Sequence, residues 1–206
     1  MKHEWRKHEK GMYVPKAAPE QIDVPTFAFF SIEGKGNPND SHFSEYIEVL
    51  YSLSYAVRMS YKSGLAPDSY EEYTVYPLEG VWDLNDQAKK KYDGTFNKDD
   101  LLFNLMIRQP DFVTSDFAEM MLQITKEKKP HKLLEHVIFQ KITEGKCVQM
   151  MHVGSYDDEP KSFSLMQSYC DENNLIRKSK RHREIYLSDV RKVAPEKLKT
   201  VLRFKV

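Results

Sequence analysis

The apolar positions in the first half of the chain predict one strand, one long helix and two further strands. Apolar residues dominate residues 26–34, a stretch bounded by proline and glycine, as in a buried strand. From residue 43 to residue 61 they recur every three or four positions, which is typical of an amphipathic helix. Residues 71–84 and 100–109 have the character of strands again. The first half therefore predicts a β-α-β-β unit.

The second half repeats this order of elements after one additional helix. Pro130 ends the additional helix, because proline removes a helical hydrogen bond, and Pro160 lies near the first turn of the next helix. A tight turn is predicted at Glu144-Gly145, between two strands. The predicted elements are a helix over 114–129, strands over 135–143 and 146–154, a helix from Pro160 to Asn173, a strand over 183–189, a short helix over 194–202 and a terminal strand over 203–206.

The order strand, turn, helix, strand, strand thus occurs twice, although the two halves share no visible sequence identity. This pattern predicts an α+β fold of duplicated β-α-β-β units with pseudo-twofold symmetry, in which two small antiparallel sheets meet at a central seam. Residues 1–22 are expected to form an extended N-terminal leader, because turn-forming residues are frequent there. The remaining domain, 23–206, divides into halves of about 23–112 and 113–206.

Charge and composition narrow the class of protein. The chain has 206 residues, and its 31 basic residues equal its 31 acidic residues in number. There is consequently no excess positive charge to attract nucleic acid or an anionic membrane. The two cysteines are too few for a disulfide scaffold and suit a reducing compartment. No apolar run approaches the about 20 residues that span a bilayer, and no signal peptide is visible. We expect a soluble, cytoplasmic protein without nucleic-acid or membrane partners.

Two familiar cofactor and metal motifs fail on their details, and one catalytic arrangement stays open. The segment "GKGNPN" (34–39) follows a strand, but the third glycine of a dinucleotide-binding turn is replaced by asparagine. The segment "HKLLEH" (131–136) has one residue too many for a reversed zinc-protease motif, and no other histidine or cysteine cluster has metal spacing. A Ser-His-Asp triad stays open, although no Gly-x-Ser-x-Gly nucleophile elbow is present. We expect no cofactor and no metal.

A carboxylate and a phenol lie two residues apart in the predicted strand "HREIYLSD". Because side chains alternate along a strand, Glu184 and Tyr186 point to one face while Ile185 and Leu187 point to the other. If Ile185 and Leu187 are buried in a core, the opposite face presents Glu184 and Tyr186 together. Water is one possible surrounding for this pair, and a ligand pocket is the other.

Aromatic residues near strand ends are the second candidate feature. Tyr76 and Trp82 share one face if the strand alternates regularly, and Phe112 directly follows another strand, where a side chain can overhang a cleft. Tyr51 and Tyr55 lie to one side of the apolar stripe of the helix over 43–61. Simple packing is the competing explanation. Trp82 is then a core or edge residue, and Phe112 packs on the helix over 114–129.

Several stretches together resemble one family, the GyrI-like small-molecule-binding proteins. The resemblance covers about Thr26 to Val206 and implies a duplicated β-α-β-β fold whose two halves enclose a drug-sized pocket. It also implies that Glu184 faces the pocket, where multidrug-binding members meet cationic aromatic ligands, and that Tyr186 follows on the same face. The chain has no room for the DNA-binding domain of many members and resembles the free-standing type. The stretches are "SIEGKGNPND", "VYPLEGVW", "RQPDFV" and "HREIYLSDVRKVAPEKLKTVLR".

The segments "PLEGVW" and "EIYLSD" look most like the subfamily that detoxifies cyclopropanoid DNA-alkylating compounds by hydrolysis. Val190, where proline is expected, is a departure that lies past the site. The resemblance implies that Glu184 takes a proton from the attacking water and that Tyr186 binds the ligand carbonyl or the water. Trp82, Phe112 and Tyr76 are expected to stack on a flat aromatic ligand, and Tyr55 is expected to be a further ligand-binding residue.

Two other functions use the same residue types. A non-catalytic protein that sequesters drugs or senses a ligand needs the same carboxylate and aromatic side chains, and an accessory protein that interacts with gyrase is the third alternative. For all three we expect a monomer or a weak homodimer, and for the first two a cationic or aromatic small-molecule ligand. The sequence alone does not separate a pocket that reacts from one that only binds.

Overall fold

A computed structural model describes residues 2–206 and divides into two compact units that interleave along the chain. Unit 1 contains residues 2–4, Phe27–Leu78 and Leu84–Ile142. Unit 2 contains Trp5–Thr26, Glu79–Asp83 and Thr143–Val206. The boundaries of these units differ from the expected halves of 23–112 and 113–206, since two segments of unit 2 precede residue 112.

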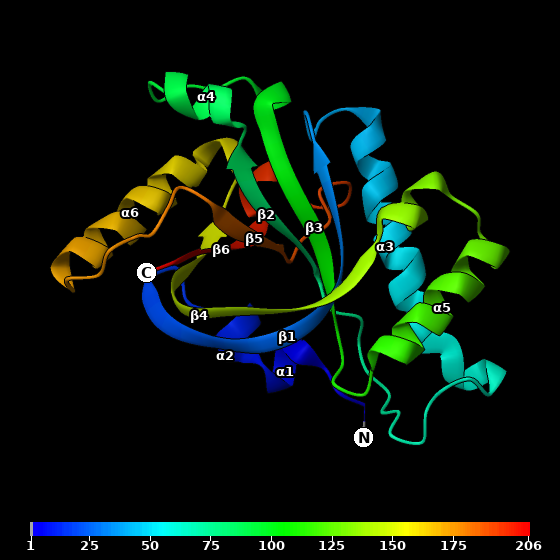
Figure 1. Cartoon of the computed structure of the whole chain (residues 1–206). Coiled ribbons are helices and arrows are strands. Elements are labelled where there is room, and N and C mark those ends of the chain that lie inside the picture. The colour runs from blue at the N-terminus through cyan, green and yellow to red at the C-terminus, as the bar shows by residue number, and fades with distance from the viewer. Residues whose placement is uncertain (1) are drawn as a thin grey trace. The chain divides into compact units, whose positions relative to one another are not determined.

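The described residues form six strands and six α-helices (Figure 1). The strands are β1 (Glu20–Lys35), β2 (Leu78–Leu84), β3 (Leu101–Gln109), β4 (Ile138–Val153), β5 (His182–Tyr186) and β6 (Lys199–Lys205). The helices are α1 (Trp5–His8), α2 (Lys10–Tyr13), α3 (Ser41–Met59), α4 (Asp86–Lys91), α5 (Ser115–Lys128) and α6 (Glu159–Glu172). Short 3-10 turns, among them η4 (Tyr156–Asp158) and η5 (Pro195–Lys197), connect several of them.

Unit 1 is built from paired strands and two packed helices. β1 and β3 are antiparallel, with Ala28 opposite Gln109 and Lys35 opposite Leu102. Leu50, Leu53 and other apolar residues of α3 are buried because they recur at helical spacing. α3 packs against β3 and α5, and α3 and α5 lie side by side (Figure 1).

Unit 2 contains the antiparallel pairs β2–β5, β5–β6 and β6–β4. β6 is therefore the middle strand of the series β5–β6–β4. α6 contributes to a core cluster with β4 and β6, because its buried positions follow one another at helical spacing. The buried members of this cluster are Val148, Met150, Met166, Cys170, Leu202 and Phe204.

The predicted duplication is confirmed. The order β1-α3-β2-β3 is repeated as β4-α6-β5-β6, and α5 stands between the two repeats. In each repeat the first strand pairs antiparallel with the last, β1 with β3 and β4 with β6. The α+β class and the duplicated β-α-β-β units are therefore features of the structure. Within the described residues, no helix combines the length and apolar character required to cross a bilayer.

A buried ion network holds the interior of unit 2. Arg183 lies against Glu79 and, at 3.0 Å, against Glu144, which also accepts a 3.0 Å hydrogen bond from Arg203. Burial alone raises the pKa of Glu144, but the charges of Arg183 and Arg203 hold it below its ordinary value. Arg203 also donates a 2.7 Å bond to the carbonyl of Met12. The network thus fixes the N-terminal segment to strand β6.

The N-terminal residues depart from the expected extended leader. α1 and α2 are helical, and β1 already begins at Glu20. Trp5 and Tyr13 are buried, with ring centroids 5.3 Å apart. Burial of these two large aromatic side chains stabilises helices that are too short to show apolar periodicity.

Two predictions about β4 and β6 were wrong. No tight turn interrupts β4 at Glu144-Gly145, because Gly145 adopts a φ of 71° within a continuous strand. Glycine tolerates this left-handed conformation without strain, so the strand bends there and continues. The predicted helix over 194–202 is reduced to the short turn η5, and β6 begins at Lys199. Central pairing with both β4 and β5 fixes these residues as a strand.

Two further strands are shorter than predicted. Of the predicted strand over 71–84, only Leu78–Leu84 forms β2. Pro77, which lacks a backbone N–H and cannot donate to a sheet, directly precedes it. β5 ends at Tyr186, so the last three residues of the predicted strand over 183–189 lie outside the regular sheet.

Candidate functional site

A chain of hydrogen bonds links four side chains of β2 and β5 in unit 2. The indole N–H of Trp82 donates to the hydroxyl oxygen of Tyr186 over 2.7 Å. The Tyr186 hydroxyl donates to Oε2 of Glu184 over 2.8 Å, and Nε2 of His182 lies 3.1 Å from Oε1 of the same carboxylate. Trp82, His182, Glu184 and Tyr186 are called the Glu184 cluster below.

Strand geometry explains why these side chains meet. Alternation along β5 places His182, Glu184 and Tyr186 on one face, while Ile185 on the other face is completely buried. In the antiparallel β2–β5 pair, Trp82 lies opposite His182 and Gly80 lies opposite Glu184. Directly opposite residues project to the same side. Because Gly80 has no side chain, none competes there for the space beside Glu184.

The Glu184 cluster is largely withheld from solvent. Glu184 is 9% exposed and Trp82 is 6% exposed. Burial raises the pKa of Tyr186 well above its ordinary value, and the charge and hydrogen bond of Glu184 raise it further. Tyr186 therefore keeps its proton at neutral pH and acts as a donor. Its hydroxyl hydrogen is directed to Glu184, which fixes the orientation of the carboxylate.

Two residues that sequence reasoning missed, Tyr156 and Glu159, adjoin this cluster. The Tyr156 ring lies edge-to-face with Tyr186, with centroids 6.1 Å apart. Glu159 begins α6 and is 7% exposed, and its Oε1 atom has no hydrogen-bond partner among the described residues. Burial, followed by the charge of Glu184, raises the pKa of Glu159 far above its ordinary value.

One sequence signal could have revealed Glu159. It precedes Ser162 by three positions, and Met166 and Cys170 follow at steps of four, so all four share one face of α6. This is the buried face of the helix. The segment "SYDDEP" (155–160) has three acidic residues followed by proline, a composition typical of an exposed turn, which concealed the inward position of the last carboxylate.

Comparison with known proteins decides the family. Residues 17–206 match the model of the GyrI-like small molecule binding domain. The chain belongs to the GyrI-like family. A crystal structure of a Listeria innocua protein described as a hydrolase is 34% identical, with a TM-score of 0.87 and 98% of each chain covered. A second, uncharacterized conserved protein from the same organism is 36% identical, with a TM-score of 0.89 and the same coverage. No match was found among curated proteins.

The other aromatic residues predicted to bind ligand belong to unit 1 of this GyrI-like protein. Tyr76 is 3% exposed, and the Arg108 guanidinium lies 4.5 Å from its ring centroid. Phe112 contacts the rings of Tyr70 and Tyr73, at centroid distances of 5.1 and 5.9 Å. These contacts amount to aromatic packing. They give a structural account of Tyr76 and Phe112 that does not require a ligand.

Tyr55 is the most exposed of the predicted ligand-binding residues. It is 48% exposed on α3, and the centroid of its ring lies 6.3 Å from that of Tyr51. The structure therefore brings Trp82, Glu184 and Tyr186 into one hydrogen-bonded group, while the role of Tyr55 stays a prediction.

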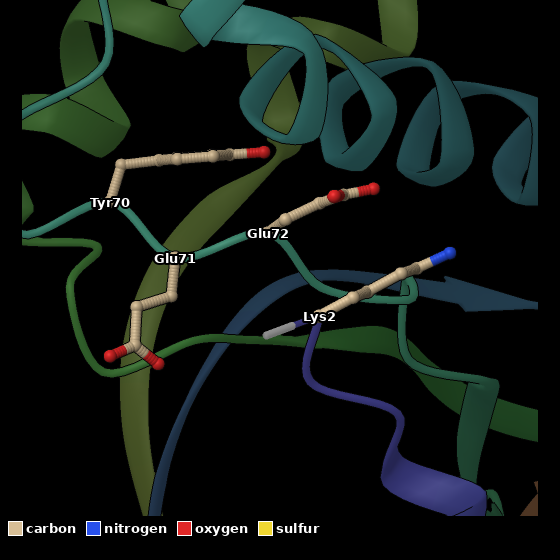
Figure 2. A pocket seen from close by; sticks show the side chains of 4 residues that line it. All are labelled: Lys2, Tyr70, Glu71 and Glu72. Carbon is tan, nitrogen blue, oxygen red and sulfur yellow. The ribbon is translucent and has the colours of Figure 1, made fainter.

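Two surface hollows of unit 1 contain none of the predicted site residues. One is lined by Lys2, Tyr70, Glu71 and Glu72. Figure 2 shows that the Glu71 side chain points away from those of the other three. A second hollow is lined by Lys126, Pro130, His131, Lys132 and Glu135. Buried hydrogen bonding, rather than a surface depression, marks the Glu184 cluster as the candidate site.

The Ser-His alternative has a specific counterpart in unit 2. His152 is 4% exposed, with Nδ1 lying 2.8 Å from the Ser162 hydroxyl and Nε2 lying 2.9 Å from the Ser155 carbonyl oxygen. A carbonyl thus occupies the position that an aspartate takes in a triad, so the arrangement is a buried, fully bonded histidine. Within residues 2–206, no group of three or more histidine, cysteine or acidic side chains is placed to hold a metal ion.

Proposed function

We propose that this GyrI-like protein binds flat, drug-like aromatic molecules at the Glu184 cluster and hydrolyses cyclopropanoid DNA-alkylating compounds. The observation that carries the proposal is the orientation of Glu184 by Tyr186 and, through Tyr186, by Trp82. A general base must be held in a fixed position, and a buried carboxylate that accepts from both Tyr186 and His182 meets that requirement. Trp82 supplies an aromatic side chain on the same hydrogen-bonded chain.

The reaction begins with a water molecule that donates a hydrogen bond to Glu184. As Glu184 takes the proton, the water oxygen forms a bond to the methylene carbon of the strained ring. One carbon–carbon bond of the cyclopropane breaks, and its electron pair moves into the conjugated dienone. The dienone oxygen then takes up a proton, and the product is a phenol that contains one added water.

We infer a positioning role for Tyr186. Its only hydroxyl hydrogen is donated to Glu184, and its oxygen accepts the Trp82 indole hydrogen. In this arrangement Tyr186 orients the base and has no hydrogen left for the ligand carbonyl. The proton that reaches the dienone oxygen therefore comes from another group.

The comparisons support hydrolysis as the general class of reaction. The Listeria innocua protein described as a hydrolase shares 34% identity over nearly the whole chain. The cyclopropanoid substrate class rests on the resemblance of "PLEGVW" and "EIYLSD" to the detoxifying subfamily. Two free, buried cysteines suit the reducing cytoplasm that we propose for the protein.

A mass-spectrometric assay tests the proposal. The purified protein is incubated with a spirocyclopropyl dienone in substrate excess, and the product is followed for the gain of one water. Glu184→Gln keeps the size of the side chain but removes its basicity, so turnover should fall by about 10²–10⁴-fold. Glu172→Gln, at the exposed end of α6, is the matched control and should keep the wild-type rate. Wild-type turnover by Glu184→Gln would refute the catalytic role.

A non-catalytic binding protein is the second candidate. The observation that favours it is that both Glu184 oxygens already have partners, Tyr186 and His182, which makes a fixed anionic site for a cationic ligand. In that case the wild-type protein binds aromatic cations saturably and never produces the water adduct. Glu184→Gln then weakens the binding of a cation more than that of a neutral ligand of similar shape.

A further inference from the structure

A second buried carboxyl lies beside Glu184 and has no function in the steps above. Glu159 is 7% exposed in the first turn of α6, and its Oε1 atom is buried without a hydrogen-bond partner among the described residues. Buried polar atoms are nearly always hydrogen-bonded, so such an atom in a folded protein calls for an explanation. A carboxyl that served only to stabilise the helix start would remain near solvent or accept backbone bonds.

The surroundings of Glu159 determine where the proton lies. Both carboxyl oxygens of Glu184 accept hydrogen bonds, from Tyr186 and His182, whereas Oε1 of Glu159 has no donor among residues 2–206. A buried carboxyl oxygen without a donor favours the neutral acid, and burial, followed by the charge of Glu184, raises the pKa of Glu159. Glu159 therefore keeps its proton near neutral pH. The titratable groups that interact with it are Glu184 and Tyr186 of β5 and Tyr156 and Asp157 of η4.

We propose that Glu159 is the general acid of the site and delivers its proton to the ligand oxygen as the ring opens. This inference rests on the proposed function. The water oxygen bonds to the methylene carbon, its proton goes to Glu184, and the ring carbon–carbon bond breaks. The Glu159 O–H bond breaks as the dienone oxygen becomes a phenol hydroxyl. A proton then returns from Glu184 to Glu159, so no oxidant or further reactant is required.

The assignment predicts a preference among ligands. A neutral carboxylic acid donates a hydrogen bond to a carbonyl, whereas a cation beside it would favour loss of its proton. Substrates that present a ketone-type oxygen to Glu159 should therefore react. Permanently cationic aromatic molecules should bind through the carboxylate of Glu184 and should not react. Glu159 thereby separates reactive from merely bound ligands.

The experiment compares Glu159→Gln, Glu159→Asp and the control Glu172→Gln in single-turnover hydrolysis of a spirocyclopropyl dienone across a range of pH. The wild-type rate should fall at alkaline pH as Glu159 loses its proton. Glu159→Gln should lose about 10²-fold in rate and lack this alkaline limb, while Glu159→Asp should recover part of the rate. Infrared spectra without ligand provide a separate readout. The carboxylic-acid band should be absent in Glu159→Gln and present in Glu184→Gln.

The outcomes distinguish the inference from the proposed function. If the wild-type protein forms the water adduct and Glu159→Gln retains the full rate and the alkaline limb, the acid role is overturned and hydrolysis stands. If the wild-type protein forms no adduct, the proposed function fails and the acid role fails with it. If Glu159→Gln does not fold, Glu159→Asp and the infrared band decide. The inference would be overturned if the pH–rate profile of Glu159→Asp were the same as that of wild type, or if the wild-type protein lacked the infrared carboxylic-acid band.

Discussion

The indole nitrogen of Trp82 lies 2.7 Å from the phenol oxygen of Tyr186, so an aromatic residue of β2 is joined by a hydrogen bond to a residue of β5. Trp82 therefore has a hydrogen-bonding role in addition to the ligand-stacking role that we propose for it. Its N–H occupies one lone pair of Tyr186 and leaves the hydroxyl hydrogen for Glu184. The position of the proposed base depends on a side chain in another strand.

Replacing Trp82 separates its packing from its hydrogen bond. Trp82→Phe keeps much of the apolar surface but removes the donor to Tyr186. The free energy of unfolding should therefore fall by about 1 kcal/mol, and hydrolysis should slow. Trp82→Ala should lower the free energy of unfolding by about 3–5 kcal/mol, because the side chain is only 6% exposed and its removal leaves a cavity. Urea denaturation and single-turnover rates measure both effects. Trp5→Phe, a buried control in α1, should lose stability without slowing hydrolysis. Equal rates in the two Phe variants would contradict the orienting role of Trp82.

Tyr186→Phe tests how far Glu184 depends on its orienting partner. The variant removes the donor to Oε2 of Glu184 and the Tyr186 acceptor for Trp82, which should lower the free energy of unfolding by about 1–3 kcal/mol. The rate should fall by about 10–100-fold, less than for loss of the base itself. Tyr156→Phe keeps the neighbouring ring and serves as the control. A rate in Tyr186→Phe equal to that of wild type would show that the carboxylate needs no such support.

The buried pair Glu79–Arg183 should behave asymmetrically on mutation. Burial raises the pKa of Glu79, while the charges of Arg183 and Arg203 favour its ionised form. Glu79→Ala leaves Arg183 without one of its carboxylates in the interior and should reduce the free energy of unfolding by about 3–5 kcal/mol. The double variant Glu79→Met/Arg183→Met should be much closer to wild type. Urea denaturation of the single and double variants decides, and a double variant as unstable as the single would contradict this account.

Glu159 should make stability depend on pH. Its pKa in the folded state is raised, mainly by burial and then by the charge of Glu184. The folded state therefore holds a proton that the unfolded state releases above about pH 4.3. This contribution is fully present below that ordinary pKa and is lost as pH rises toward the folded-state value. Glu159→Gln has no carboxyl at this position and therefore does not lose this stability as the pH rises. Its stability relative to wild type should increase between pH 5 and pH 8, measured by urea denaturation.

Glu172→Gln is the control for the pH experiment. This exposed residue at the end of α6 should give a curve of stability against pH parallel to that of wild type. If Glu159→Gln gives a parallel curve as well, Glu159 does not hold its proton in the folded protein.

Local periodicity accounts for the parts of the fold that the sequence could predict. The helices α3, α5 and α6 were predictable because apolar residues recur at helical spacing, and Glu184 and Ile185 were assigned to opposite faces because β5 alternates. The pairing of Trp82 with Tyr186 was not predictable, because it depends on the β2–β5 register. Gly145 looked like a turn because glycine permits both a reversal and a bend within a strand.

The N-terminal segment shows a different limit of sequence reasoning. α1 and α2 are held by long-range bonds, such as that from Arg203 to the Met12 carbonyl, which no local pattern encodes. Glu159 was missed for a related reason, since an acidic residue next to Pro160 at a helix start is ordinarily exposed. Tertiary burial, rather than propensity, decides the state of both.

The central position of β6 determines the order in which unit 2 can be completed during synthesis. β6 is the last described strand to be synthesised, yet it lies between β4 and β5 and carries Arg203, the partner of Met12 near the beginning of the chain. Unit 2 thus cannot fold progressively as the chain emerges, which is the usual course for segments nearer the N-terminus. Until Arg203 emerges, the Met12 carbonyl of α2 lacks this donor, and the edges of β4 and β5 that pair with β6 stay open. Nascent chains stalled before residue 199 should consequently be the form most dependent on chaperones.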